Sequence, residues 1–280
     1  MKRILTIQDI SCLGKCSLTV ALPLISAMGV EAVILPTAML STHTMFKGFT
    51  VKDLSDQIRP IAEHWKKEGV KFDAIYTGYL GTQEEIGMIR ELIRDFRGEN
   101  TLIFVDPAMG DNGKLYPAFD EAYAKANAGL CSDADVIVPN ITEGAFMTDM
   151  PYLDSYGEDY VREMLGRLCG LGAKTSVLTG VSLSEGMTGV MGYDTEKGEY
   201  FSYQHKRIPK SYHGTGDIFS SVALGGVVRG LGWWEAFRIA ADYTADTIAV
   251  TMKNEDNPWY GVDFETTIPR LTQELSKALG

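Results

Sequence analysis

Short apolar runs alternate with longer amphipathic segments along this chain, and this alternation restricts its possible folds more than any other feature. The runs are rich in Ile and Val and lack regular polar alternation, which is typical of strands buried on both faces. In residues 53–68 and 83–97, apolar side chains recur at helical spacing, which predicts helices with one face on a core. The predicted strands are residues 3–7, 31–35, 73–77, 101–105, 135–138 and 175–179.

A repeated strand–helix pattern predicts an α/β fold, here a three-layer sandwich in which a mostly parallel sheet has helices on both faces. Residues 188–193 and 199–203 form two short strand-like runs, which predict a hairpin at the sheet edge. No linker-like segment or internal repeat divides the sequence, so we expect one domain over residues 1–280. Helical segments are predicted after the hairpin at residues 216–229, 234–251 and 266–279.

Composition restricts the partners of the chain. A formal net charge of −11 argues against nucleic acid or an anionic membrane as the main partner. An acidic protein can still bind an anionic nucleotide through backbone amides, helix N-termini or Mg²⁺. The sequence has no apolar stretch of about 20 residues and no signal-peptide core, so we expect a cytoplasmic protein with reduced cysteines.

Acidic, amide and glycine residues follow several of the predicted strands. Ligands of open α/β sheets bind beyond the carboxyl ends of the strands, so these residues are predicted to share one rim. They are Gln8-Asp9, Pro36-Thr37, Gly180 and the segments 78–82, 106–111 and 139–143.

The segment His213-Gly214-Thr215-Gly216-Asp217 precedes an apolar helical stretch. Two glycines let backbone amides converge on an anion, and the start of a helix adds positive potential. Asp217, in the first turn, could then accept a proton from a hydroxyl that attacks a γ-phosphate. The same residues also fit a Thr N-cap followed by a favourable acid, and the segment alone leaves both interpretations open.

Asn140 and Glu143 allow two interpretations as well. Glu143, directly or through water, could hold Mg²⁺ against ATP phosphates. The pair also fits a capping box without a metal, which is the interpretation it favours when taken alone. Asp106 and Asp111 flank a turn, and residues 112–114 are expected to form either a mobile loop over the nucleotide or a plain turn.

Together these segments resemble the ribokinase-like superfamily and, within it, the pyridoxal (vitamin B6) kinases. The resemblance runs over nearly the whole chain in the right order. Ser41-Thr42-His43-Thr44 and Thr77-Gly78-Tyr79-Leu80-Gly81 are closer to vitamin kinases than to sugar kinases. The other matching segments are residues 7–9, 106–111, 139–143 and 214–217.

The resemblance implies transfer of the ATP γ-phosphate to the 5′-hydroxyl of pyridoxal, pyridoxine or pyridoxamine. It implies ATP and Mg²⁺ as cofactors, K⁺ as an assisting cation, and a homodimer. Asp217 would be the base, and the amides of Gly214, Thr215 and Gly216 would form an anion hole that also binds ATP. The other residues implied at ATP are Asp106, Asn140, Glu143 and Thr179, with Glu143 and Asp106 at the metal, and those implied at the substrate are Asp9, Thr44, Tyr79 and Asp217.

The sequence departs from the family pattern at two site positions. Asp9 stands where Ser often faces the pyridine nitrogen, and a carboxylate there could pair with a protonated ring. Thr179 stands where some members carry a Lys that reaches the phosphates. The main alternative function is a hydroxymethylpyrimidine kinase of thiamine synthesis. A catalytically silent carrier of vitamin B6 or nucleotide is disfavoured, because a carrier needs neither a base nor a metal site.

Overall fold

The computed structural model describes residues 1–257 and 259–280, which form two compact units. The first unit comprises Met1–Pro60, Gly69–Ala74 and Ile208–Gly280, and the second comprises Ile61–Glu68 and Ile75–Arg207. The expectation of one domain over residues 1–280 stays a prediction.

In the first unit, β1 (Arg3–Leu13) and β2 (Glu31–Thr42) pair in parallel, and β3 (Val51–Asp53) pairs antiparallel with β2. Both long strands begin where predicted, but the predicted ends at residues 7 and 35 are wrong. In β1, the polar side chains of Gln8 and Asp9 are buried and stay within the ladder, which shifts register between Gln8 and Ile10. Asp9 therefore lies inside a strand, at a bulge, and not beyond its end.

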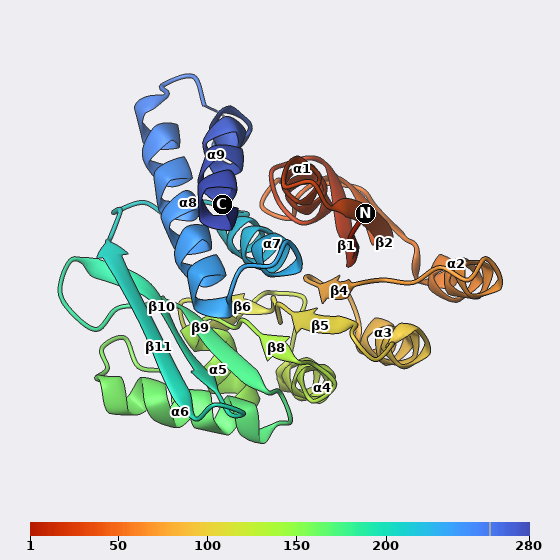
Figure 1. Cartoon of the computed structure of the whole chain (residues 1–280), viewed down its shortest axis with the longest axis horizontal. Helices are drawn as coiled ribbons and strands as arrows, with labels where there is room; N and C mark the ends of the chain where they lie inside the picture. Colours follow the sequence, from red (N-terminus) through yellow and green to blue (C-terminus); the bar gives the residue numbers. More distant parts are fainter. Residues whose placement is uncertain (258) are drawn as a thin grey trace. The chain divides into compact units, whose positions relative to one another are not determined.

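The helices of the first unit pack around α7 (Thr215–Val228). Helix α7 contacts α1 (Leu18–Ala27) and α8 (Trp233–Lys253), and Figure 1 shows α7 between them. Every residue from Ile218 to Gly226 is buried, which explains why this segment has no polar face. The chain ends with α9 (Ile268–Leu279), preceded by a 3₁₀ turn, η1 (Glu265–Thr267).

In the second unit, parallel strands lie side by side and an antiparallel hairpin forms the edge of the sheet (Figure 1). Parallel pairing joins β5 (Leu102–Val105), β8 (Val136–Ile137) and β9 (Thr175–Val181). Strands β10 (Met187–Asp194) and β11 (Glu199–Lys206) form the predicted edge hairpin. Strand β4 (Ala74–Thr77) follows β5 in the sheet order. The predicted α/β class with a mostly parallel sheet is confirmed.

The helices of the second unit start at capping residues that the sequence provides. The Oγ1 of Thr82 accepts the N–H of Glu85 at 3.1 Å at the start of α3 (Gln83–Phe96). Helix α6 (Glu158–Gly170) packs on β9 and β10. The remaining helices are α4 (Glu121–Cys131), α5 (Ile141–Thr148) and α2 (Ser55–Lys67), whose residues are divided between the units. Among the described residues, no helix has the length and apolar character needed to cross a membrane.

Residues 110–115 form a small hairpin of β6 (Gly110–Asp111) and β7 (Lys114–Leu115). Asn112 and Gly113, with φ of 51° and 75°, occupy the left-handed conformations that a two-residue type I′ turn requires. Residues 112–114 thus form the expected turn, and closure of this segment over a nucleotide stays a prediction. The Gly113 N–H donates to Thr142 Oγ1 at 2.9 Å, which fastens the hairpin to α5.

Candidate active site

Helix α7 begins at a left-handed glycine and leaves its first amides available. Gly214 has φ 83° and is the N-cap, while the Thr215 hydroxyl donates to the Tyr212 carbonyl at 3.2 Å. The alternative of Thr215 as a side-chain cap is therefore wrong. No described side chain caps α7, and the first N–H groups of a helix have no partner within it. The amides that begin at Thr215 and Gly216 thus offer an anion site at the positive end of the helix dipole.

A chain of hydrogen bonds links Asp217, Ser17 and Asp9 within the first unit. The Ser17 N–H donates to Asp217 Oδ2 at 2.9 Å, and the Ser17 hydroxyl donates to Asp9 Oδ1 at 2.5 Å. Ser17 has φ 49° and ψ −132°, a conformation of type II′ turns that glycine dominates, and such strain is worth about 1–3 kcal/mol. Asp9 is 5% exposed, and burial raises the pKa of its carboxyl, although the hydroxyls of Ser17 and Ser11 oppose the shift.

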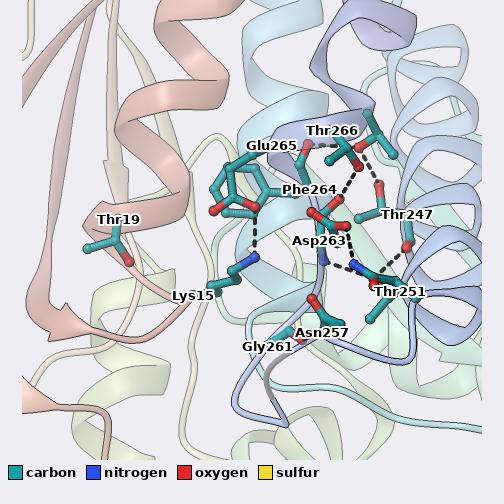
Figure 2. A network of polar contacts seen from close by, with 12 residues as sticks. Lys15, Thr19, Thr247, Thr251, Asn257, Gly261, Asp263, Phe264, Glu265 and Thr266 are labelled. Atoms are coloured by element: carbon teal, nitrogen blue, oxygen red, sulfur yellow. Dashed lines mark hydrogen bonds and ion pairs between the residues drawn. The ribbon is translucent and has the colours of Figure 1, made fainter.

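The loop after β1 is held against the start of α7. A Cβ on Gly214 would overlap the backbone carbonyl oxygen of Lys15, so only glycine fits this approach. Figure 2 shows that the Lys15 ammonium reaches Glu265, at an Nζ–Oε2 distance of 2.8 Å. The Lys15 stem also packs against Gly261 and lies near the ring of Phe264. The loop that carries Ser17 is thus fixed from both sides.

Two histidines of the first unit lie ring to ring, with centroids 4.6 Å apart. The backbone N–H of Met45 can only donate, so His43 Nδ1 accepts it at 3.2 Å, and Nε2 then carries the proton that it donates to the Tyr260 carbonyl at 3.0 Å. Burial lowers the pKa of His43. Burial and the neighbouring His43 lower the pKa of His213 to about 4, so both rings are neutral near pH 7.

In the second unit, Asn140 and Glu143 form the capping box that the sequence favoured. Asn140 Oδ1 accepts the Glu143 N–H at 3.0 Å, and Glu143 Oε2 accepts the Asn140 N–H at 2.8 Å. Glu143 Oε1 accepts the Met109 N–H at 3.1 Å, and Asn140 Nδ2 donates to the Gly110 carbonyl at 2.9 Å. Glu143 therefore fixes the residues after β5 to the start of α5.

The acids of this region fit Mg²⁺ in charge and in ligand type. Asp106 and Glu143 are buried, and burial together with the charge of Asp106 raises the pKa of Glu143 well above its ordinary value. A cation would relieve this excess of negative charge, and carboxylate oxygens are ligands that Mg²⁺ prefers. In the described part of the chain, no group of three or more metal-ligating side chains forms a closed cage. Water and phosphate oxygens would complete the coordination, as is usual for Mg²⁺.

The other predicted residues lie in one unit or the other. Thr44 is exposed in the turn after β2, in the first unit. In the second unit, the Tyr79 ring lies 5.3 Å from that of Phe119, which stacks on Tyr123 at 3.8 Å. Thr179 lies in β9, where its N–H donates to the Pro139 carbonyl at 2.9 Å. Asp9, Thr44, Gly214, Thr215, Gly216 and Asp217 belong to the first unit, and Tyr79, Asp106, Asn140, Glu143 and Thr179 to the second.

Sequence reasoning missed Ser17 as a functional residue. Its bond to Asp217 joins positions 200 residues apart, so no local pattern could have indicated it. The ring contact between His43 and His213 was missed for the same reason, although His43 lies in a segment that carried the family resemblance and His213 directly precedes another.

The mostly parallel sheet, the surrounding helices and the acid at the glycine-rich start of α7 define a phosphotransferase of the ribokinase-like class. The chain belongs to the phosphomethylpyrimidine kinase family, whose sequence profile matches residues 22–259.

Comparison with individual proteins confirms the resemblance to the pyridoxal kinases. A Schizosaccharomyces pombe protein assigned to these kinases is 27% identical over 205 residues, which span 69% of this chain and 58% of that protein. The crystal structure of pyridoxal kinase from Lactobacillus plantarum is 30% identical, with a TM-score of 0.90 and coverage of 99% of each chain. A Bacteroides thetaiotaomicron protein assigned to the phosphomethylpyrimidine kinases, in a crystal form with pyridoxal, is 37% identical, with a TM-score of 0.92 and coverage of 96% and 95%.

Proposed function

We propose that this chain transfers the γ-phosphate of ATP to the 5′-hydroxyl of pyridoxal, pyridoxine or pyridoxamine. The observation that carries the proposal is Asp217, an acid in the first turn of a helix whose N-terminus has no side-chain cap, oriented by the Ser17 N–H at 2.9 Å. Membership of the family and the likeness to a relative crystallised with pyridoxal support a hydroxymethyl group on an aromatic ring as the acceptor.

In the proposed reaction, Asp217 accepts the proton of the substrate hydroxyl. The hydroxyl oxygen forms a bond to the γ-phosphorus while the bond from that phosphorus to the β-phosphate oxygen breaks, and ADP leaves. The amides at the start of α7 stabilise negative charge on the phosphoryl oxygens without any Lys or Arg. Asn140 and Thr179 are assigned to ATP, Asp106 and Glu143 to the Mg²⁺ that neutralises phosphate charge, and Thr44, Tyr79 and Asp9 to the vitamin.

The family resemblance further supports a homodimer, assistance by K⁺ and a single kinase domain over residues 1–280. The acidic net charge supports small-molecule partners and not nucleic acid, and we assign the protein to the cytoplasm. A second candidate is phosphorylation of hydroxymethylpyrimidine, because the family that matches this chain is that of the phosphomethylpyrimidine kinases.

A panel of acceptors tests the proposal, with ADP release measured in the presence of ATP and Mg²⁺. We expect turnover of at least one B6 vitamer, and a loss on the order of 10²–10⁴ in kcat for Asp217→Asn with ATP affinity nearly unchanged. Turnover of hydroxymethylpyrimidine but of no B6 vitamer would favour the second candidate. Near wild-type kcat in Asp217→Asn would show that the assigned base is wrong.

A further inference from the structure

We propose that Ser17 is a positioning residue that holds Asp217 in place, and that Asp9 acts through Ser17. The inference rests on the proposed function, because it concerns the base of that reaction. It gives Asp9 a role within the protein in addition to its proposed contact with the vitamin.

Ser17 uses its two donors on two different acids. Its backbone N–H donates to Asp217 Oδ2 at 2.9 Å, and its hydroxyl donates to Asp9 Oδ1 at 2.5 Å. Asp9 is buried in β1, and its other oxygen, Oδ2, accepts the Ser11 hydroxyl at 3.2 Å. Both oxygens of Asp9 are therefore engaged by side chains of the first unit, and Asp9 is a fixed anchor for Ser17.

The backbone of Ser17 indicates that this anchor is needed. A serine with φ 49° and ψ −132° keeps its conformation only where surrounding contacts determine it. Without the hydroxyl, the strained residue can relax toward ordinary φ and ψ values, and the N–H then turns away from Asp217. The loop is fixed elsewhere by Lys15, through Gly214 and Glu265, so the change would be confined to the residues around Ser17.

Loss of this donor has an electrostatic signature. A carboxylate that loses a backbone N–H is less stable in its charged form, so a base in that position is protonated at a higher pH. Titratable groups that interact with these acids include the buried Cys16 thiol, which interacts with both Asp217 and Asp9, and His43, which interacts with Asp9. His213 faces His43, and Lys15 is paired with Glu265. Hydrogen bonds to charged groups correspond to a shift of about one pH unit.

The test compares Ser17→Ala with Ser17→Gly, using kcat, KM and the pH profile of kcat/KM. In Ser17→Ala we expect kcat to fall on the order of 10²-fold with KM within about twofold, and the acid limb to move up by about one pH unit. Ser17→Gly should lose less, because glycine takes this conformation without strain. Asp149→Ala is the matched control, since exposed Asp149 is also left-handed, with φ 53°. It should lower the melting temperature without moving the acid limb.

An unmoved acid limb and near wild-type kcat in Ser17→Ala would overturn the inference, and so would an equal shift in Asp149→Ala. A readout that needs no acceptor separates this outcome from failure of the proposed function. The ¹³C resonance of the Asp217 carboxyl, identified by its loss in Asp217→Asn, should titrate at a higher pH in Ser17→Ala. If no B6 vitamer is turned over, the proposed function fails. The role of Ser17 is then tested by the titration of Asp217 alone, and a titration that is the same in Ser17→Ala and the wild type would overturn it.

Discussion

Gly214→Ala perturbs the start of α7 in two ways that a control can separate. At φ 83°, an alanine pays the penalty of left-handed backbone, about 1–2 kcal/mol. Its Cβ would also overlap the carbonyl oxygen of Lys15, a backbone atom that cannot rotate away. To restore an ordinary contact, the loop must retreat by on the order of 1 Å.

Gly198→Ala carries the first effect without the second. Gly198 has φ 67° in the edge hairpin, and nothing lies within 4 Å of an added Cβ. For a chain of this size, about 1–2 kcal/mol lowers the melting temperature by roughly 2–8 °C. Gly214→Ala should lower it further and should also reduce kcat/KM by on the order of 10²-fold, because a displacement of about 1 Å at a reacting group has an effect of that size.

Thermal unfolding and kcat/KM with pyridoxal, measured on both variants and the wild type, decide the outcome. The two variants should differ in both quantities, and Gly198→Ala should retain the wild-type kcat/KM. If Gly214→Ala matched Gly198→Ala in melting temperature and in activity, the close approach of Lys15 to Gly214 would have no energetic or catalytic importance, and the reasoning would be refuted.

Two further predictions concern pH. The folded chain holds the proton of Glu143 more tightly than the unfolded chain, because burial and Asp106 raise its pKa, so ionisation of Glu143 opposes folding. Without nucleotide, the stability contributed by this group should fall as pH rises above about 4.5, and melting curves of Glu143→Gln across pH should have a flatter slope. The pKa of His213 is lowered from 6.5 to about 4, so the unfolded chain gains a proton first as pH falls from 6.5 to 4. Over this pH interval, protonation of His213 in the unfolded chain should lower the free energy of unfolding of the wild type, measured in urea, by up to about 3 kcal/mol. His213→Gln should not show this loss. His64→Gln, whose side chain is 70% exposed, should follow wild type, and an identical response of both variants would exclude His213 as the cause.

Local signals predicted much of the fold. The apolar stripe and the capping residue of α3 lie within a short stretch of sequence, and that helix begins and ends within a residue of its predicted limits. The end of β1 was wrong because Gln8, Asp9 and Ser11 are polar, and their burial depends on partners outside the strand. The β6–β7 turn had a readable signal, since Asn-Gly is typical of two-residue hairpins.

In the candidate site, too, the local features were predicted from the sequence and the long-range contacts were not. The capping box of Asn140 and Glu143 is local, and the sequence favoured it correctly. The placement of Asp217 in the first turn of α7 was also predicted, because glycines and an apolar run mark the helix start. The hydrogen bond from Ser17 and the ring of His213 against His43 required the folded chain, because tertiary contacts between distant segments create them.

The composition of the two units has a consequence for biosynthesis. The first unit needs both Met1–Pro60 and Ile208–Gly280, whereas nearly all of the second unit is the continuous stretch Ile75–Arg207. During translation, the segments around Asn140 and Glu143 leave the ribosome before Asp217 has been made. The hydrogen bond from Ser17 to Asp217 cannot form until the chain has been extended by a further 200 residues. The second unit, with its capped α5, is therefore synthesised before the residue that Ser17 bonds, and phosphotransfer that uses Asp217 as base can begin only after α7 has been made.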